Sequence, residues 1–292
     1  MLPNFLIIGV QKAGTTSLIN YLSQHPDVFV PHDKEIPYFH DDSYFQKGLD
    51  YYKKQFDGWK GETMVGLAPV NTFFYAEKAA PRLYEYNPSM KLILILRNPI
   101  DRAYSHYWYC RRNALESTSF ESAMTRELQL IESGCREEMP CVYYISHGFY
   151  YEQLEVYLKY FPLDKFLILF YDELKSNPRA VMQRIYLYLG IEETYINGIG
   201  RKHNVASIPR IASLHKLVYQ QNPLKRIYKS ILPENLQQYA QRTLVSRLLK
   251  KNLIPTQYPP MKSKTREMLV EIFKGPNRKL SNLLGRDFSH WA

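Results

Sequence analysis

The sequence predicts an α/β fold, in which a central parallel sheet is flanked by helices. Apolar runs of strand length alternate with segments whose apolar residues recur at helical spacing. The strand candidates are Phe5–Val10, Met64–Leu67, Leu92–Leu96 and Phe166–Tyr171, and the helix candidates between and after them include Ala76–Glu85, Phe120–Glu132 and Tyr150–Phe161. Alternation of this kind is typical of a parallel sheet, because each crossover between parallel strands needs a connecting helix.

The first predicted strand runs directly into a loop of glycine, lysine and hydroxyl residues. A helix predicted over Thr15–Ser23 follows, with Leu18, Ile19 and Leu22 placed to pack back on the strand. Backbone N–H groups at such a helix N-terminus converge on an anion, and nearby hydroxyls add donors. The predicted phosphate-binding residues of this loop are Gln11, Lys12, Ala13, Gly14, Thr15, Thr16 and Ser17.

The loop departs from the Walker pattern G-x-x-x-x-G-K-[ST]. Gly9 and Gly14 have its spacing, but Thr15 stands at the lysine position and the lysine lies at Lys12. A nucleoside triphosphatase also needs an acid after a neighbouring strand to hold magnesium, whereas the predicted strand Leu92–Leu96 is followed by Arg97. We therefore predict a P-loop-like sheet with a metal-free nucleotide site, in which Lys12 and Arg97 bind different phosphates. The alternative is a glycine turn beside a strand-end arginine.

Four blocks of the chain resemble the superfamily of sulfotransferases that use 3′-phosphoadenosine 5′-phosphosulfate (PAPS), in particular its heparan sulfate and bacterial branch. Their order and spacing cover nearly the whole chain. The blocks are QKAGTTS at 11–17, DKEIPYF at 33–39, LRNPIDRAYSHY at 96–107 and IFKGPNRKLSNLLGRDFSHW at 272–291. The resemblance implies that the first block binds the 5′-phosphosulfate and that Arg97 and Ser105 bind the 3′-phosphate.

The resemblance also implies the catalytic roles. PAPS is the expected cosubstrate and adenosine 3′,5′-bisphosphate (PAP) the product, with no metal. Glu35 matches the general base of the heparan sulfate branch, and Lys12 would polarise the bridging oxygen. Lys34 either adds a second positive charge near the sulfuryl group or only flanks Glu35. Arg201 stands where relatives carry a basic loop over the 3′-phosphate, although the match to K-G-R is poor.

Histidines are the alternative bases, since a histidine does this work in the cytosolic small-molecule branch. The candidates here are His40, His106 and His147, and each is better explained as a core or turn histidine.

The acceptor side departs from the heparan sulfate pattern. Ile36 and Pro37 follow Glu35 where those enzymes usually have a histidine, and GLAP at 66–69 lacks the lysine of their E-K-S-P-like segment. We therefore expect a small-molecule acceptor, such as a natural product, that carries a hydroxyl or an amine. The alternatives are a carbohydrate O-sulfotransferase, a non-catalytic nucleotide- or anion-binding protein and a P-loop kinase.

The net charge of +10 is concentrated in one part of the 292-residue chain. Residues 201–251 contain eleven Lys or Arg and a single acid, Glu234, with apolar residues at helical spacing and breaks at Pro223 and Pro233. We expect a basic helical segment over 201–260 within a single sulfotransferase domain spanning 1–292. It is either a solvated face, a field that attracts an anionic ligand, or a homodimer surface. No nucleic-acid-binding signature accompanies the charge.

The sequence also predicts the compartment. No apolar run reaches the length of a membrane span, and the first strand begins four residues after Met1, which leaves no room for a signal peptide. The three cysteines, Cys110, Cys135 and Cys141, fit free thiols in a reducing compartment, with a Cys135–Cys141 bridge as the alternative. We expect a cytoplasmic protein without stable membrane insertion.

Overall fold

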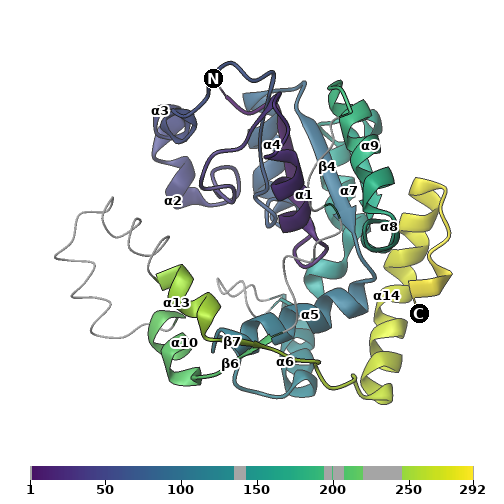
Figure 1. The fold of residues 1–292 in the computed structure, drawn as a ribbon. Helices are drawn as coiled ribbons and strands as arrows, with labels where there is room; N and C mark the ends of the chain where they lie inside the picture. The colour runs from purple at the N-terminus through teal and green to yellow at the C-terminus, as the bar shows by residue number, and fades with distance from the viewer. Residues whose placement is uncertain (1, 135–142, 194–198, 200–206, 220–244, 292) are drawn as a thin grey trace. The chain divides into compact units, whose positions relative to one another are not determined.

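The computed structural model describes residues 2–134, 143–193, 199, 207–219 and 245–291 (Figure 1). The chain divides into two compact units. The first comprises residues 1–102, 146–203 and 267–292, and the second comprises residues 103–145 and 204–266. The single domain expected over 1–292 stays a prediction.

The first unit contains the predicted parallel sheet. Its strand order is β2-β3-β1-β4-β5, and every neighbouring pair is parallel. The strands are β1 (Phe5–Gly9), β2 (Val28–Phe29), β3 (Met64–Leu67), β4 (Lys91–Leu96) and β5 (Phe166–Phe170). All residues of β1 and β3 are buried, which explains why these strands read as continuous apolar runs rather than alternating ones. The predicted α/β class is confirmed.

Helices pack around this sheet and close a single apolar core in the first unit (Figure 1). They are α1 (Thr15–Leu22), α2 (Asp42–Phe45), α3 (Gly48–Lys53), α4 (Ala76–Tyr86), α7 (Tyr150–Leu158), α8 (Tyr171–Ser176) and α9 (Pro178–Leu189). Short 3₁₀ turns lie at Lys54–Phe56, Ser146–Gly148, Leu163–Lys165 and Ser289–Trp291. Two long helices belong to both units: α5 (Pro99–Arg112) begins in the first, and α14 (Ser263–Leu284) begins in the second.

Several ends of predicted strands and helices shift by one residue, and two differences are larger. Strand β2 was not predicted, because two residues are too few to form a pattern. Helix α7 ends at Leu158 rather than Phe161. Phe161 directly precedes Pro162, and the proline ring disfavours helical backbone angles at the residue before it.

The second unit contains helices α6 (Phe120–Ser133), α10 (Ala212–Tyr219) and α13 (Ser246–Lys251). The basic segment was predicted to be helical, and this is only partly correct. It also contains strands β6 (Ser207–Pro209) and β7 (Leu253–Pro255), which pair antiparallel. Each ends in a proline, which cannot donate a ladder hydrogen bond and is compatible with an exposed, two-stranded ribbon. The predicted breaks at Pro223 and Pro233 lie outside the described residues.

No helix within the described ranges is long and apolar enough to cross a membrane. Cys110 is a buried free thiol. Cys135 and Cys141 lie outside the described residues.

Candidate functional site

The loop after β1 forms a cradle at the N-terminus of α1. Gly14 adopts a left-handed conformation (φ 95°) as the helix N-cap, and Lys12 before it also has a positive φ of 73°. The N–H groups of Ser17 and Leu18 donate to the Gly14 carbonyl at 2.9 and 3.2 Å. The N–H groups of the first turn that precede them point out of the helix, and no acidic residue lies in that turn. The loop therefore presents donors and a positive helix end to an anion.

Gly14 is required both for its backbone angle and for space. A Cβ at this position would lie 2.8 Å from Cδ2 of Leu174 on α8. We expect Gly14→Ala to lower the free energy of unfolding by about 2–3 kcal/mol, since left-handed strain costs about 1–2 kcal/mol and the contact adds to it. Gly48→Ala is the matched control, because Gly48 has a φ of +80° with no atom within 4 Å of the added Cβ. Thermal unfolding measures both variants, and an equal loss of stability in the two would contradict the steric part of this prediction.

Arg97 follows the neighbouring strand β4, and its side chain reaches the cradle. The parallel pairing of β1 and β4 places their carboxyl ends at the same edge of the sheet. Nη1 of Arg97 donates to the backbone carbonyl of Lys12 at 2.8 Å. The structure thus brings together Lys12 and Arg97, the two cations that the sequence predicts to bind phosphate groups.

Two tyrosines that sequence reasoning missed hold Arg97 in place. The Tyr171 ring lies under the guanidinium, 4.5 Å from its central carbon to the ring centroid, and the Tyr150 hydroxyl donates to the Arg97 carbonyl at 2.8 Å. Tyr171 directly follows β5, so its position after a strand of the same sheet is a signal that could have identified it. Tyr150 has no such signal, because only the tertiary fold brings its hydroxyl to the Arg97 carbonyl.

The segment that contains Glu35 is fixed to the same edge of the sheet. Nζ of Lys34 donates to Oδ1 of Asn20 on α1 at 2.6 Å, and the Lys34 carbonyl accepts from the N–H of Ala68, just after β3, at 2.7 Å. Asn20 was also missed, because an asparagine on the polar face of a helix gives no signal of its own. Lys34 is therefore anchored beside Glu35 rather than projecting freely.

Glu35 has the electrostatics of a candidate base. Loss of hydration among the surrounding protein atoms raises the pKa of its carboxyl above the ordinary value. The positive charge of Lys34 opposes this shift, the negative charge of Asp33 adds to it, and Lys12 opposes it again. Because the side chain remains accessible at the surface, the carboxyl can still meet a ligand. A raised pKa makes a carboxylate a stronger proton acceptor.

The histidines named as alternative bases are less suitable. Burial lowers the pKa of His40 to about 4, and its Nδ1 shares a hydrogen bond of 3.0 Å with the Thr72 hydroxyl. His147 is 4% exposed and stacks on Phe74 at a centroid distance of 3.7 Å. His106 is 1% exposed, in the second unit. These surroundings agree with core histidines.

Two predicted site residues are not placed beside Arg97. Ser105 lies on α5 in the second unit, and its part in binding a 3′-phosphate stays a prediction. Arg201 lies outside the described residues. Among the residues that are described, no three or more His, Cys, Asp or Glu side chains gather into a metal-binding group.

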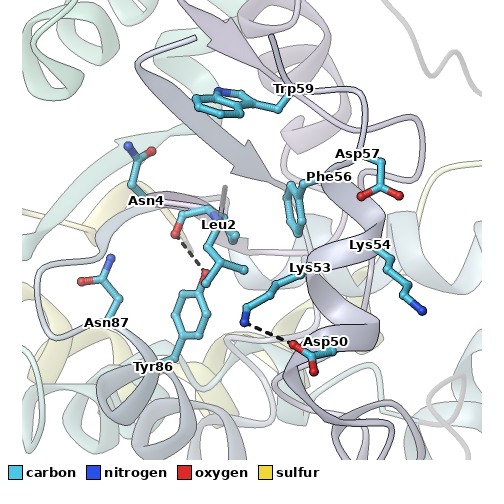
Figure 2. A pocket seen from close by; sticks show the side chains of 11 residues that line it. Leu2, Asn4, Asp50, Lys53, Lys54, Phe56, Asp57, Trp59, Tyr86 and Asn87 are labelled. Carbon is cyan, nitrogen blue, oxygen red and sulfur yellow. Dashed lines mark hydrogen bonds and ion pairs between the residues drawn. The ribbon is translucent and has the colours of Figure 1, made fainter. Parts of the chain in front are cut away.

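A pocket of about 1050 Å³ lies elsewhere in the first unit (Figure 2). Phe56, Trp59 and Tyr86 line it, and Lys53 pairs with Asp50 at 3.2 Å. It also includes Asn4 and Asn87, which precede β1 and β4. The pocket is thus at the amino ends of these strands, opposite the edge where ligands of open α/β sheets bind. We do not assign it to the candidate site.

Comparisons with known proteins show which proteins the chain resembles. Residues 2–273 match the model of the sulfotransferase domain. The chain is 29% identical to human bifunctional heparan sulfate N-deacetylase/N-sulfotransferase 3, over 99% of this chain and 31% of that protein. It is 26% identical to the membrane-associated sulfotransferase kil1 of Dictyostelium discoideum, over 98% of this chain and 66% of that protein. The chain thus spans less than two thirds of the length of either relative.

A solved structure is similar over its whole length. The sulfotransferase from Alicyclobacillus acidocaldarius superimposes with a TM-score of 0.71 at 26% sequence identity, covering 100% of this chain and 99% of that one.

Proposed function

Since the chain belongs to the sulfotransferase domain family, we propose that it transfers the sulfuryl group of PAPS to a hydroxyl or amine of a small-molecule acceptor and releases PAP. The observation that carries this proposal is that Lys12 and Arg97 lie together at one edge of the sheet. The Arg97 guanidinium is 2.8 Å from the backbone carbonyl of Lys12. Glu35 is close enough to Lys12 for the lysine charge to lower the pKa of its carboxyl. This edge offers both halves of the reaction: cations for the donor and a base for the acceptor.

The residues of the cradle fit a phosphorylated donor. Its donors are the first-turn N–H groups of α1, the Lys12 ammonium and the part of the Arg97 guanidinium that does not bind the loop. In addition, Oε1 of Gln11 is buried and has no hydrogen-bond partner within the described residues. Buried acceptors are rarely left unpaired, so a donor group of a bound nucleotide is a suitable partner for this atom.

The proposed mechanism is an in-line displacement. Glu35 takes the proton from the acceptor O–H or N–H as the acceptor atom forms its bond to sulfur, while the bond between sulfur and the bridging oxygen breaks. The electron pair of that bond leaves with PAP. Lys12 and the N–H groups of the loop stabilise the negative charge that develops there. Lys34, held by Asn20, adds positive charge beside the base.

The raised pKa of Glu35 predicts the pH dependence of the reaction. The base must be ionised, so kcat/KM should fall as the pH drops through a pKa above the usual carboxyl value of about 4.3. Lys34→Gln removes the charge that lowers this pKa most, and should move the acid limb of the profile to higher pH. Rates measured from about pH 4 to about pH 9 test this. An acid limb at the ordinary value that Lys34→Gln does not move would contradict the assignment of Glu35.

The activity itself is tested with PAPS labelled in the sulfuryl group. We expect label to pass to members of a panel of small alcohols, phenols and amines, and not to desulfated heparan sulfate oligosaccharides. Ile36, Leu67 and Ala68 have apolar, buried side chains, so these positions, which differ from the heparan sulfate pattern, supply no cation to the acceptor. Preferential labelling of the oligosaccharides would instead support the carbohydrate O-sulfotransferase that the names of several relatives favour.

Three further points stay proposals. A non-catalytic nucleotide-binding protein would bind PAP but label no acceptor. The cytoplasmic location expected from the sequence is a proposal, and one relative differs in that it is named as membrane-associated. A homodimer is likewise a proposal.

A further inference from the structure

The ribbon of β6 and β7 in the second unit exposes an apolar face. Ile208 and Ile254 lie directly opposite each other in the antiparallel register, so their side chains share one face, and they are 43% and 39% exposed. Ser207, the neighbour of Ile208 in the strand, is instead buried. The flanking segments also carry large exposed apolar side chains. Ile211, Leu217 and Leu248 are each between 50% and 55% exposed.

This surface is held rigidly by a single buried asparagine. Asn252 joins the end of α13 to β7, and its carbonyl accepts from the N–H of Arg210 at 2.7 Å. Its side chain accepts from the N–H of Ile211 at 3.0 Å and donates to the Ile211 carbonyl at 2.9 Å. The segments before α10 and after α13 are therefore locked together, and the apolar side chains are presented by a preformed scaffold.

The same segments are exclusively basic. Residues 207–219 and 245–258 contain no Asp or Glu, and their cations are Arg210, Lys216, Arg247, Lys250 and Lys251. Arg210 and Lys251 are exposed. A surface that combines exposed isoleucine and leucine with the exposed cations Arg210 and Lys251 suits a partner that offers both an apolar interior and anionic groups.

A cavity of about 350 Å³ lies beside the ribbon. Arg111, Arg112 and Trp108 line it together with Ser207, Ile208 and Pro209. Nη1 of Arg111 donates to the Ser117 carbonyl at 2.7 Å, and Nη1 of Arg112 donates to the Ser207 hydroxyl at 3.2 Å. Both arginines therefore bind neutral oxygens and keep their charge available to an anion.

The acid that also lines this cavity is already engaged. The carboxylate of Glu116 pairs with Arg126 and accepts from the N–H groups of Ser117 and Thr118, each at 2.9 Å. Arg126 on α6 therefore compensates its charge, so that Glu116 does not cancel the charge of Arg111 and Arg112.

We propose that the exposed apolar and basic side chains of these segments, called here the ribbon surface (Ile208, Ile211, Leu217, Leu248 and Ile254 with Arg210 and Lys251), bind peripherally to anionic phospholipid membranes. The apolar side chains enter the interfacial layer, the cations meet the anionic head groups, and the Arg111–Arg112 cavity accepts a lipid phosphate. A second copy of the chain is a poor partner for this surface, because like charges would face each other. A nucleic acid could use the cations but leaves the isoleucines in water.

Cosedimentation of the full-length protein with vesicles tests this proposal. We expect binding to phosphatidylcholine vesicles that contain about 30% phosphatidylserine, little binding to phosphatidylcholine alone, and weakening by salt. The variant Arg210→Gln/Lys251→Gln should bind about 25-fold more weakly, since each basic residue near an anionic surface contributes about fivefold. Ile208→Ser/Ile254→Ser should lose at least about tenfold. Leu187→Ser is the control: Leu187 is 84% exposed on α9 of the first unit, and its replacement should leave vesicle binding unchanged.

Three results would overturn the proposal. They are no binding of the wild type to anionic vesicles, full binding by the isoleucine double variant, and equal weakening by Leu187→Ser. Tight binding to DNA that does not depend on the isoleucines, together with weak vesicle binding, would assign the surface to a polyanion instead. Thermal unfolding verifies that the variants fold. If the isoleucine variant does not fold, the variant of Arg210 and Lys251 still decides the outcome, because both residues are exposed.

Discussion

Glu35→Gln is expected to lower kcat by about 10²–10⁴-fold and to leave the affinity for PAP within about twofold of the wild type. Glutamine has the shape of glutamate but cannot take a proton from the acceptor. The donor cradle is formed by other residues, from the loop after β1 and from Arg97, so nucleotide binding should persist. Initial rates with labelled PAPS measure the first effect, and calorimetric titration with PAP measures the second.

Glu77→Gln is a matched control for this substitution, because Glu77 is an exposed glutamate in the first turn of α4. It should retain wild-type turnover and affinity. Full turnover in Glu35→Gln would contradict the assignment of Glu35 as base and return attention to His40. Equal loss of turnover and PAP affinity would show that Glu35 supports the donor site rather than the proton transfer.

Arg97→Ala is expected to weaken PAP binding by about 10–100-fold. A hydrogen bond to a charged group contributes about 1.5–3 kcal/mol. In the proposed site this arginine binds a phosphate, and it also donates to the Lys12 carbonyl of the cradle. Arg97→Lys should recover only part of the affinity, because one ammonium cannot replace a planar guanidinium that binds the loop and stacks on Tyr171. Titration calorimetry with PAP measures both variants.

Arg179→Ala provides the comparison, since Arg179 is an exposed arginine near the start of α9. It should bind PAP like the wild type. Unchanged affinity in Arg97→Ala, with wild-type thermal unfolding, would remove Arg97 from the donor site.

Most of the sheet could be predicted from the sequence, and so could the approach of Arg97 to the loop that contains Lys12. β3 was predicted to the residue and β4 to within one residue, because fully buried parallel strands are uninterrupted apolar runs. The convergence of Lys12 and Arg97 was also predictable, since both follow strands of one parallel sheet and such ends meet at one edge.

The supporting contacts could not be predicted in the same way. Asn20 holds Lys34, and Tyr171 and Tyr150 hold Arg97, through pairs that lie 14, 74 and 53 residues apart in the chain. Only the tertiary fold brings these pairs together. Of the three residues, Tyr171 alone has a signal in the sequence, because it stands at the end of an apolar strand. The ribbon of β6 and β7 was missed for a related reason, because two strands of three residues are too short to show alternation.

Metal-free calorimetry of the wild-type protein tests the central claim most directly. The protein would be titrated in the presence of a chelator with PAP, with adenosine 5′-monophosphate, which lacks the 3′-phosphate, and with ATP. A donor site built from the cradle and Arg97 predicts that PAP binds without metal and at least about tenfold more tightly than adenosine 5′-monophosphate, with ATP weaker than PAP. Equal affinity for PAP and adenosine 5′-monophosphate, or tight binding of ATP alone and only when magnesium is restored, would contradict the account.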